Sequence, residues 1–298
     1  MGAPYLYEYF NVTFPQEYVV HVEINREKKL NAFFDRLSTD SSVRVIIFTG
    51  AGERAFTAGL DVQAASDSGV GSRTASGDGA RAATALRRSI LNLQDCVSSI
   101  EKCEKPVICI LHGFSLGLAI DLAVAADIRL CTTSTRFAVK EVDIGAPADA
   151  GTLSRLPKVV GSFSWVKDVC LSARMFDADE ALSVGLVSGV FVTKEEAFTE
   201  GLRQAGRIAR KSPIAVQGTK ELLNWSRDRT VADGQLIPSC PTGLIKGIGW
   251  SIVTTLIKVT AKGLRYTSVW NSAAAQSKDF NIALLSGLQK RTPRFEKL

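Results

Sequence analysis

Three acidic residues lie in a short stretch of otherwise mostly small and apolar residues, FAVKEVDIGAPADAG, which covers residues 137–151. They are Glu141, Asp143 and Asp149. A carboxylate is costly to remove from water, so an acid in an apolar pocket has a raised pKa and can exchange protons near neutral pH. Two such acids in different surroundings can divide the work of taking up and delivering a proton. The stretch therefore indicates general acid–base chemistry by a pair of its acids.

A further acid, Asp121, follows Gly117 in the segment GLAIDLAVAA, residues 117–126, which has the small and aliphatic composition of a buried helix. By itself it is predicted to be a carboxylate in the first helical turn, stabilised by the helix dipole.

The elements that would position these acids alternate between strands and helices. Apolar runs predict strands over residues 18–24, 43–50, 106–113 and 127–132. Residues 81–102 and 117–126 are predicted to be helical, with residues 73–83 a polar connector before the first of them. From about residue 161 the pattern predicts successive helices. We therefore expect an α/β core whose strand–turn–helix units stack as the turns of a spiral.

Composition and charge narrow the possible functions. The chain has 298 residues, 46% of them hydrophobic, and a formal net charge of +6, which favours anionic partners such as phosphates. No block of lysine and arginine with interleaved aromatic residues is present, so we expect no nucleic-acid partner. Two distant histidines and six cysteines without metal-type spacing predict no metal site. The most apolar run, residues 247–263, is short and interrupted by Lys258, so no membrane span is expected.

Four segments together resemble the crotonase (enoyl-CoA hydratase/isomerase) superfamily, and the fourth, which contains the acids, is most similar to its Δ3,5-Δ2,4-dienoyl-CoA isomerase branch. In that branch a glutamate follows the lysine of K-E-V-D, and an aspartate comes eight residues after it. The resemblance implies a crotonase-type spiral of ββα turns, an acyl-CoA thioester substrate, no separate cofactor because coenzyme A is part of the substrate, and a homotrimer or hexamer. The segments are NREKKLNAF (25–33), RAFTAGLDV (54–62), LHGFSLGLAIDLAVAADIRL (111–130) and FAVKEVDIGAPADAGTLSRLPKVVG (137–161).

The resemblance also implies which residues contact the substrate. The thioester oxygen would be held by the main-chain N–H groups of Leu60 and Leu118, an oxyanion hole that stabilises charge as a proton leaves C2. Leu118 stands where family members usually carry glycine, so its side chain must point away from the thioester. Read alone, the neighbouring glycines could simply form tight turns, and Lys29 could be a solvated surface charge. The implied substrate-binding residues are Lys29, Ala58, Gly59, Asp61, Val62 and Gly117.

By the same resemblance, Glu141 would be the base at C2 and Asp149 the acid at C6, with Asp121 beside them in the pocket. The residues by themselves leave open which acid serves which carbon. A hydratase typically has glutamate at both the Asp121 and Glu141 positions, so Asp121 together with Asp149 favours the dienoyl-CoA isomerase. The alternatives are a Δ3-Δ2-enoyl-CoA isomerase, an enoyl-CoA hydratase, or an inactive crotonase-fold acyl-CoA-binding or scaffold protein.

The chain departs from the family pattern in two places. Around residues 31–35 it lacks about three turns of helix, which is expected to expose core in the first turn of the spiral. Residues 235–263 form an atypical insertion in the C-terminal region. We interpret both as errors of the gene model, a skipped exon piece and a translated intron. The expected organisation is a catalytic core over residues 1–200 and a helical oligomerisation region over residues 201–298.

The expected location is the peroxisome, with the mitochondrion as the alternative. The sequence ends in Lys297-Leu298 with Glu296 in place of the serine of the peroxisomal S-K-L signal. No arginine-rich, acid-poor presequence is visible, because Glu8 and Glu17 come early.

Overall fold

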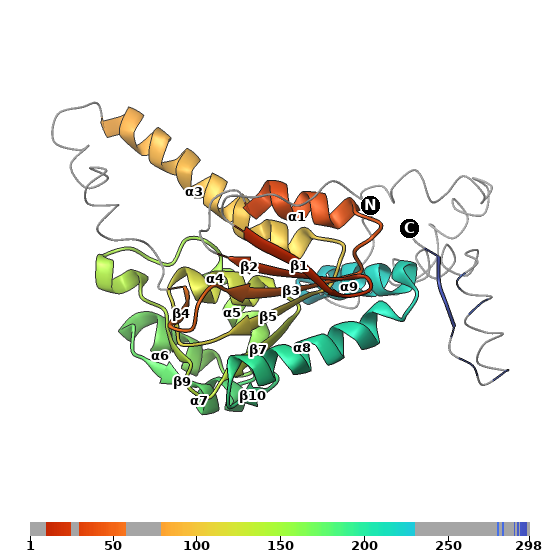
Figure 1. The fold of residues 1–298 in the computed structure, drawn as a ribbon. Coiled ribbons are helices and arrows are strands. Elements are labelled where there is room, and N and C mark those ends of the chain that lie inside the picture. Colours follow the sequence, from red (N-terminus) through yellow and green to blue (C-terminus); the bar gives the residue numbers. More distant parts are fainter. Residues whose placement is uncertain are drawn as a thin grey trace. The chain divides into compact units, whose positions relative to one another are not determined.

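The larger of two sheets contains six strands, and its inner strands are parallel (Figure 1). Only β1 runs antiparallel to its neighbour. β3 and β5 are buried along their whole length, which explains why the sequence shows them as continuous apolar runs rather than alternating ones. In sheet order the strands are β1 (Phe10–Gln16), β2 (Val19–Ile24), β3 (Val45–Gly50), β5 (Val107–Leu111), β7 (Ile128–Thr132) and β10 (Val190–Phe191).

The four strands predicted from apolar runs are confirmed as β2, β3, β5 and β7. The sequence did not reveal β1. This edge strand is mostly exposed and contains Pro15, so it lacks the apolar pattern of a buried strand.

A second, smaller sheet carries the strands that matter most for the site. Its first three strands are parallel, and β9 is antiparallel to β8. None is longer than three residues, too short for a periodic pattern to predict. In sheet order they are β4 (Ala55–Thr57), β6 (Phe114–Leu116), β8 (Arg136–Ala138) and β9 (Phe176–Asp177).

The order of the strands defines a spiral. The chain visits the large sheet at β3, β5 and β7, and after each of these it visits the small sheet at β4, β6 and β8. Each pair of strands is followed by a helix, so the repeating unit is ββα. The predicted α/β spiral of ββα turns is therefore confirmed.

The helices predicted over residues 81–102, over 117–126 and from about 161 are confirmed, whereas the helices at residues 30–39 and 152–159 were not predicted. α3 begins at Gly79, inside the segment 73–83 that we predicted to be a connector, because alanines and arginines there favour helix. The helices are α1 (Leu30–Thr39), α3 (Gly79–Lys102), α4 (Leu118–Ala125), α5 (Thr152–Val159), α6 (Phe163–Ser172), α7 (Ala178–Ser183), α8 (Lys194–Ala209) and α9 (Pro213–Arg227), with a short 3-10 helix η1 (Glu141–Ile144).

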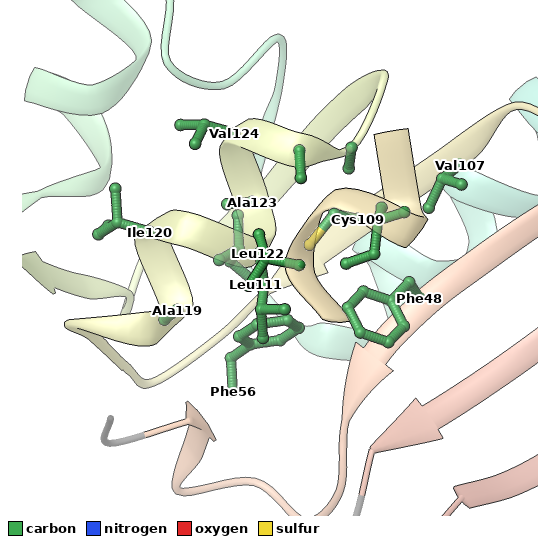
Figure 2. Packing of buried hydrophobic residues seen from close by; sticks show 14 of the residues in the cluster. Phe48, Phe56, Val107, Cys109, Leu111, Ala119, Ile120, Leu122, Ala123 and Val124 are labelled. Carbon is green, nitrogen blue, oxygen red and sulfur yellow. The ribbon is translucent and has the colours of Figure 1, made fainter. Parts of the chain in front are cut away.

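α4 lies in the hydrophobic core. All its residues after Leu118 are buried, so it is apolar on every side except at Asp121. Figure 2 shows Leu122 of this helix close to Leu111 and Cys109 of β5, with Phe56 of β4 nearby. This packing fixes the N-terminal end of α4 relative to both sheets.

The expectation of an exposed core near residues 31–35 is wrong. Phe33, Phe34 and Leu37 of α1 have no exposed surface, and Phe33 stacks on Phe10 with 4.6 Å between ring centroids. Phe34 packs edge-on against Phe48 of β3. Three large side chains on a ten-residue helix are enough to cover this part of the sheet.

The computed structural model describes residues 10–24, 30–57 and 79–229, together with residues 279, 282, 289, 291 and 293–296. The chain divides into two compact units, residues 1–206 and 207–298. The first holds both sheets, and in the second α9 is capped by Ser212, which accepts a hydrogen bond from Ala215 N and donates one to Asp279. The insertion 235–263 lies outside the described residues. No helix among those described is long and apolar enough to cross a membrane.

Candidate active site

The site lies where the parallel strands of the small sheet end. Leu116 of β6 pairs with Ala138 of β8, and Gly117 N donates a hydrogen bond of 2.9 Å to Ala138 O. Beyond these paired residues, β6 leads into α4 at Leu118 and β8 leads into η1 at Glu141. The carboxyl ends of parallel strands are the usual place for ligands in α/β proteins. The fold therefore brings the Leu118 N–H and Glu141 to one edge.

Gly117 sets the direction of the α4 N-terminus. Its φ of 54° and ψ of −115° lie in a region that residues with a Cβ rarely adopt. As the first residue of the helix, Leu118 has an N–H with no acceptor inside the helix, at the positive end of the helix dipole. The Leu118 side chain is half-buried and packs against the hydrophobic core, as its predicted role requires. The N–H is thus available to a developing negative charge.

Glu141 has the surroundings of an acid–base residue. It is half-buried, and its Oε2 atom is enclosed while no described residue donates a hydrogen bond to it. Burial raises the pKa of Glu141, and the charges of Asp121 and Asp149 raise it further, against an opposing effect of its own main-chain N–H. A buried carboxylate oxygen without a hydrogen-bond partner is costly, and such groups are typical of functional sites.

Asp121 is buried at the start of α4 and has hydrogen-bond partners of its own. It lies in the first turn of α4 and is only 1% exposed. Its Oδ1 accepts two hydrogen bonds from Thr152, from the main-chain N at 2.6 Å and from Oγ1 at 2.7 Å. Burial raises the pKa of Asp121, although the Thr152 hydrogen bonds oppose this. Asp121 therefore fixes the start of α5, and its charge also acts on Glu141.

Asp149 does not lie in an apolar pocket in this chain, which corrects our expectation that both acids are shielded from water. Its side chain is exposed. The neighbours Ala148 and Ala150 are buried, at 7% and 4% exposure, and successive residues of this irregular segment alternate in direction. When two small apolar residues turn inward, the acid between them faces outward. Asp149 is still close enough for its charge to raise the pKa values of Asp121 and Glu141.

Cys170 of α6 also lies near Glu141 and Asp121, and no sequence pattern indicated it. Burial, followed by the charges of Glu141 and Asp121, raises the pKa of its thiol to about 11, so it is a neutral side chain at the site. Thr152 was missed as well, because only the fold brings it to Asp121.

Two further acids, Asp143 and Asp127, have structural contacts. Asp143 is exposed and pairs with Lys140 at 2.8 Å. Asp127 accepts a hydrogen bond from Val107 N and anchors the start of β7 to β5.

Six of the predicted site residues lie outside the described residues: Lys29, Ala58, Gly59, Leu60, Asp61 and Val62. β4 ends at Thr57, directly before the five of these residues that run from Ala58 to Val62. Within the described part of the chain, no three histidine, cysteine or acidic residues are grouped so that they could hold a metal ion.

Comparison with known proteins defines the class. The family model for enoyl-CoA hydratase/isomerase matches residues 19–235. The chain therefore belongs to the enoyl-CoA hydratase/isomerase family, as its sequence motifs predicted.

Among its relatives, the mitochondrial Δ3,5-Δ2,4-dienoyl-CoA isomerase of Mus musculus is 37% identical over 306 residues, covering 98% of this chain and 84% of the relative. The mitochondrial enzyme of Homo sapiens with the same name is 44% identical over 238 residues, covering 76% of this chain and 72% of the relative. The peroxisomal one of Arabidopsis thaliana is 37% identical, covering 94% and 93%. Relatives of this name thus occur in both compartments.

Solved structures agree on the fold. The enoyl-CoA hydratase of Bacillus anthracis superposes with a TM-score of 0.74 at 23% identity, covering 97% of this chain and 99% of the other. The enoyl-CoA hydratase of Polaromonas sp. JS666 superposes with a TM-score of 0.75 at 18% identity, covering 96% of this chain and 99% of the other.

Proposed function

We propose that this chain is a Δ3,5-Δ2,4-dienoyl-CoA isomerase that acts in fatty-acid β-oxidation. The observation that carries the proposal is the enclosed, unpartnered Oε2 of Glu141 at the same sheet edge as the free N–H end of α4. The names of relatives that are 37–44% identical over most of the chain support the substrate.

The reaction moves one proton and two double bonds. Glu141 takes a proton from C2, and the electron pair of that C–H bond forms the C2=C3 bond. The C3=C4 pair shifts to C4=C5, and the C5=C6 pair binds a proton that Asp149 delivers to C6. Glu141 ends protonated and Asp149 ionised, and exchange with water restores both. A raised pKa makes Glu141 a stronger base than an ordinary carboxylate, which suits removal of a weakly acidic proton.

In this proposal the negative charge that develops on the thioester oxygen is stabilised by the N–H groups of Leu118 and Leu60. Such prepositioned donors typically contribute about 3–4 kcal/mol each to the transition state. Asp121 holds the start of α5 through Thr152 and keeps negative charge near Glu141. Ala58, Gly59, Asp61, Val62, Gly117 and Lys29 would line the acyl-CoA site. The chemistry needs no cofactor beyond the coenzyme A of the substrate.

The direct test supplies 3,5-dienoyl-CoA and follows the conjugated 2,4-diene by its ultraviolet absorbance. We expect turnover by the wild type and a loss of about 10²–10⁴-fold in Glu141→Gln and in Asp149→Asn. Binding of CoA should persist in both variants, because neither acid is placed on the CoA portion. Wild-type rates in either variant would refute the assignment of that acid.

The same assay separates the alternatives. A Δ3-Δ2-enoyl-CoA isomerase would shift a single double bond and leave the diene unchanged. A hydratase would add water to a 2-enoyl-CoA, and an inactive scaffold would bind acyl-CoA without turnover. The pair of Glu141 and Asp149 favours the dienoyl-CoA isomerase, because two distant carbons require two proton carriers.

We further propose that the chain forms homotrimers or hexamers through residues 201–298 and acts in the peroxisome. A relative of Arabidopsis thaliana that is named peroxisomal supports this location, and relatives named mitochondrial support the mitochondrion as the alternative. Sedimentation of the purified protein and imaging of a tagged chain in cells test the two statements.

A further inference from the structure

The main chain of Asp149 is held by a residue of the long helix α3. Gln94 Nε2 donates a hydrogen bond of 2.6 Å to Asp149 O, and the two residues lie 55 positions apart in sequence. Gln94 is half-buried. Among the described residues, no other hydrogen bond is made to Asp149, either to its main chain or to its carboxyl group.

Gln94 belongs to a polar stripe on α3 that holds the whole segment after Asp149. Ser98 and Glu101 lie one and two turns further along the same face of the helix. Arg155 of α5 donates to Glu101 Oε2 at 2.9 Å and to Ser98 Oγ at 2.9 Å. On the side of α4, Thr152 is bound to Asp121. The residues after Asp149 therefore have several anchors, whereas Asp149 itself has Gln94.

The exposure of Asp149 makes this anchor important. A buried side chain is oriented by the atoms packed around it, but an exposed carboxyl group takes its position mainly from its main chain. An error of about 1 Å in the position of a reacting group can lower a rate by about 100-fold. Ala148 and Ala150 are small side chains, and burying them gives the segment few contacts that would resist a shift.

We propose that Gln94 is a positioning residue that sets the place of Asp149 for proton delivery to C6 and has no part in proton removal by Glu141. This inference rests on the proposed function. Glu141 lies on η1, which follows β8, and within the described part of the chain Gln94 makes no hydrogen bond to η1, so the two acids depend on different supports. A loss of Gln94 should then impair proton delivery to C6 and leave proton removal from C2 unchanged.

The two halves can be measured separately in D2O. If the dienolate formed by Glu141 receives a deuteron at C2, recovered substrate carries deuterium at C2. If it receives a deuteron at C6, the conjugated product forms. The number of C2 deuterons incorporated per diene formed reports how often proton delivery fails after proton removal has succeeded.

We would compare Gln94→Met, which keeps the length of the side chain but removes the N–H donor, with Asn92→Met on an exposed position of the same helix. In Gln94→Met we expect diene formation to fall about tenfold or more and C2 deuterium per diene to rise about tenfold. Gln94→His keeps a neutral N–H donor the same number of bonds from the main chain and should restore much of the wild-type ratio. Asn92→Met should match the wild type.

A purely structural role would give a different result. If Gln94→Met lost diene formation and C2 exchange in the same proportion, or kept wild-type values for both, the inference would be overturned. A thermal melt of each variant separates a folding defect from a positioning defect. Failure of the proposed function itself is distinguishable, because the wild type would then form neither diene nor C2-deuterated substrate.

Discussion

At the scale of single residues, the site depends on a carboxylate whose pKa is raised by burial and by its neighbours. Glu141 must be ionised to accept a proton, so kcat/KM should fall as the pH drops through its raised pKa, above the ordinary value of 4.5. The charges of Asp121 and Asp149 contribute to this shift after burial. The acid limb of the pH profile therefore reports the surroundings of Glu141.

Asp121→Asn should move that limb to lower pH. The asparagine Oδ1 still accepts both hydrogen bonds from Thr152, so the start of α5 is kept while one negative charge disappears. Without that charge the pKa of Glu141 falls toward its ordinary range. The measurement is the pH dependence of kcat/KM for both proteins. An unchanged limb, or one moved to higher pH, would contradict the electrostatic link between the two acids.

At the scale of elements, the site is a meeting of strand ends and a helix N-terminus. α4 is buried on almost every side, and the conformation of Gly117 aims its first N–H groups toward the edge shared with Glu141. A change in that one residue therefore alters both the fit of the helix and the direction of the donor.

Gly117→Ala should be both less stable and less active. A Cβ at φ 54° and ψ −115° is strained by about 1–3 kcal/mol, and relief of the strain must rotate the Leu118 N–H. Urea denaturation and the diene assay measure the two effects. Gly161→Ala is the control, because a Cβ there meets no atom within 4 Å and φ is not positive. Equal behaviour of the two variants would show that Gly117 is not special.

At the scale of the molecule's first unit, Lys194 links sequence-distant parts of the large sheet. From the start of α8 its Nζ donates to Gly50 O at 3.0 Å and Gly52 O at 2.7 Å, and it lies 3.5 Å from the Glu23 carboxylate. These acceptors lie at or near the carboxyl ends of β2 and β3, directly before β4. The side chain is 14% exposed, so its charge is well shielded from water.

Lys194→Met should lower the free energy of unfolding by about 2–4 kcal/mol, because it leaves two carbonyl groups and a partly buried carboxylate without their cation. Lys102→Met removes a lysine whose ion pair with Asp95 is long and 69% exposed, and should change stability by no more than about 0.5 kcal/mol. Urea denaturation of both variants makes the comparison. A similar small effect in both would show that Lys194 is not a structural link.

The amino-acid sequence alone was enough to predict the class of fold and to nominate acids for the site. The buried parallel strands are apolar along their length, and α4 is apolar on every side except at Asp121, so local composition alone marks them. The short strands β4, β6 and β8 are different, since three residues carry no periodic signal. The motifs that carry Gly117, Asp121 and Glu141 could be recognised because their order along the chain is itself informative.

Only the tertiary structure decided how these residues are supported and how far water reaches them. The contacts of Thr152 with Asp121 and of Gln94 with Asp149 join residues 31 and 55 positions apart, and no local pattern predicts such pairs. The exposure of Asp149 follows from two alanines that turn inward, a matter of packing that composition does not express. Residue types specify the available chemistry, but the pKa values and positions depend on distances that arise only when the chain folds.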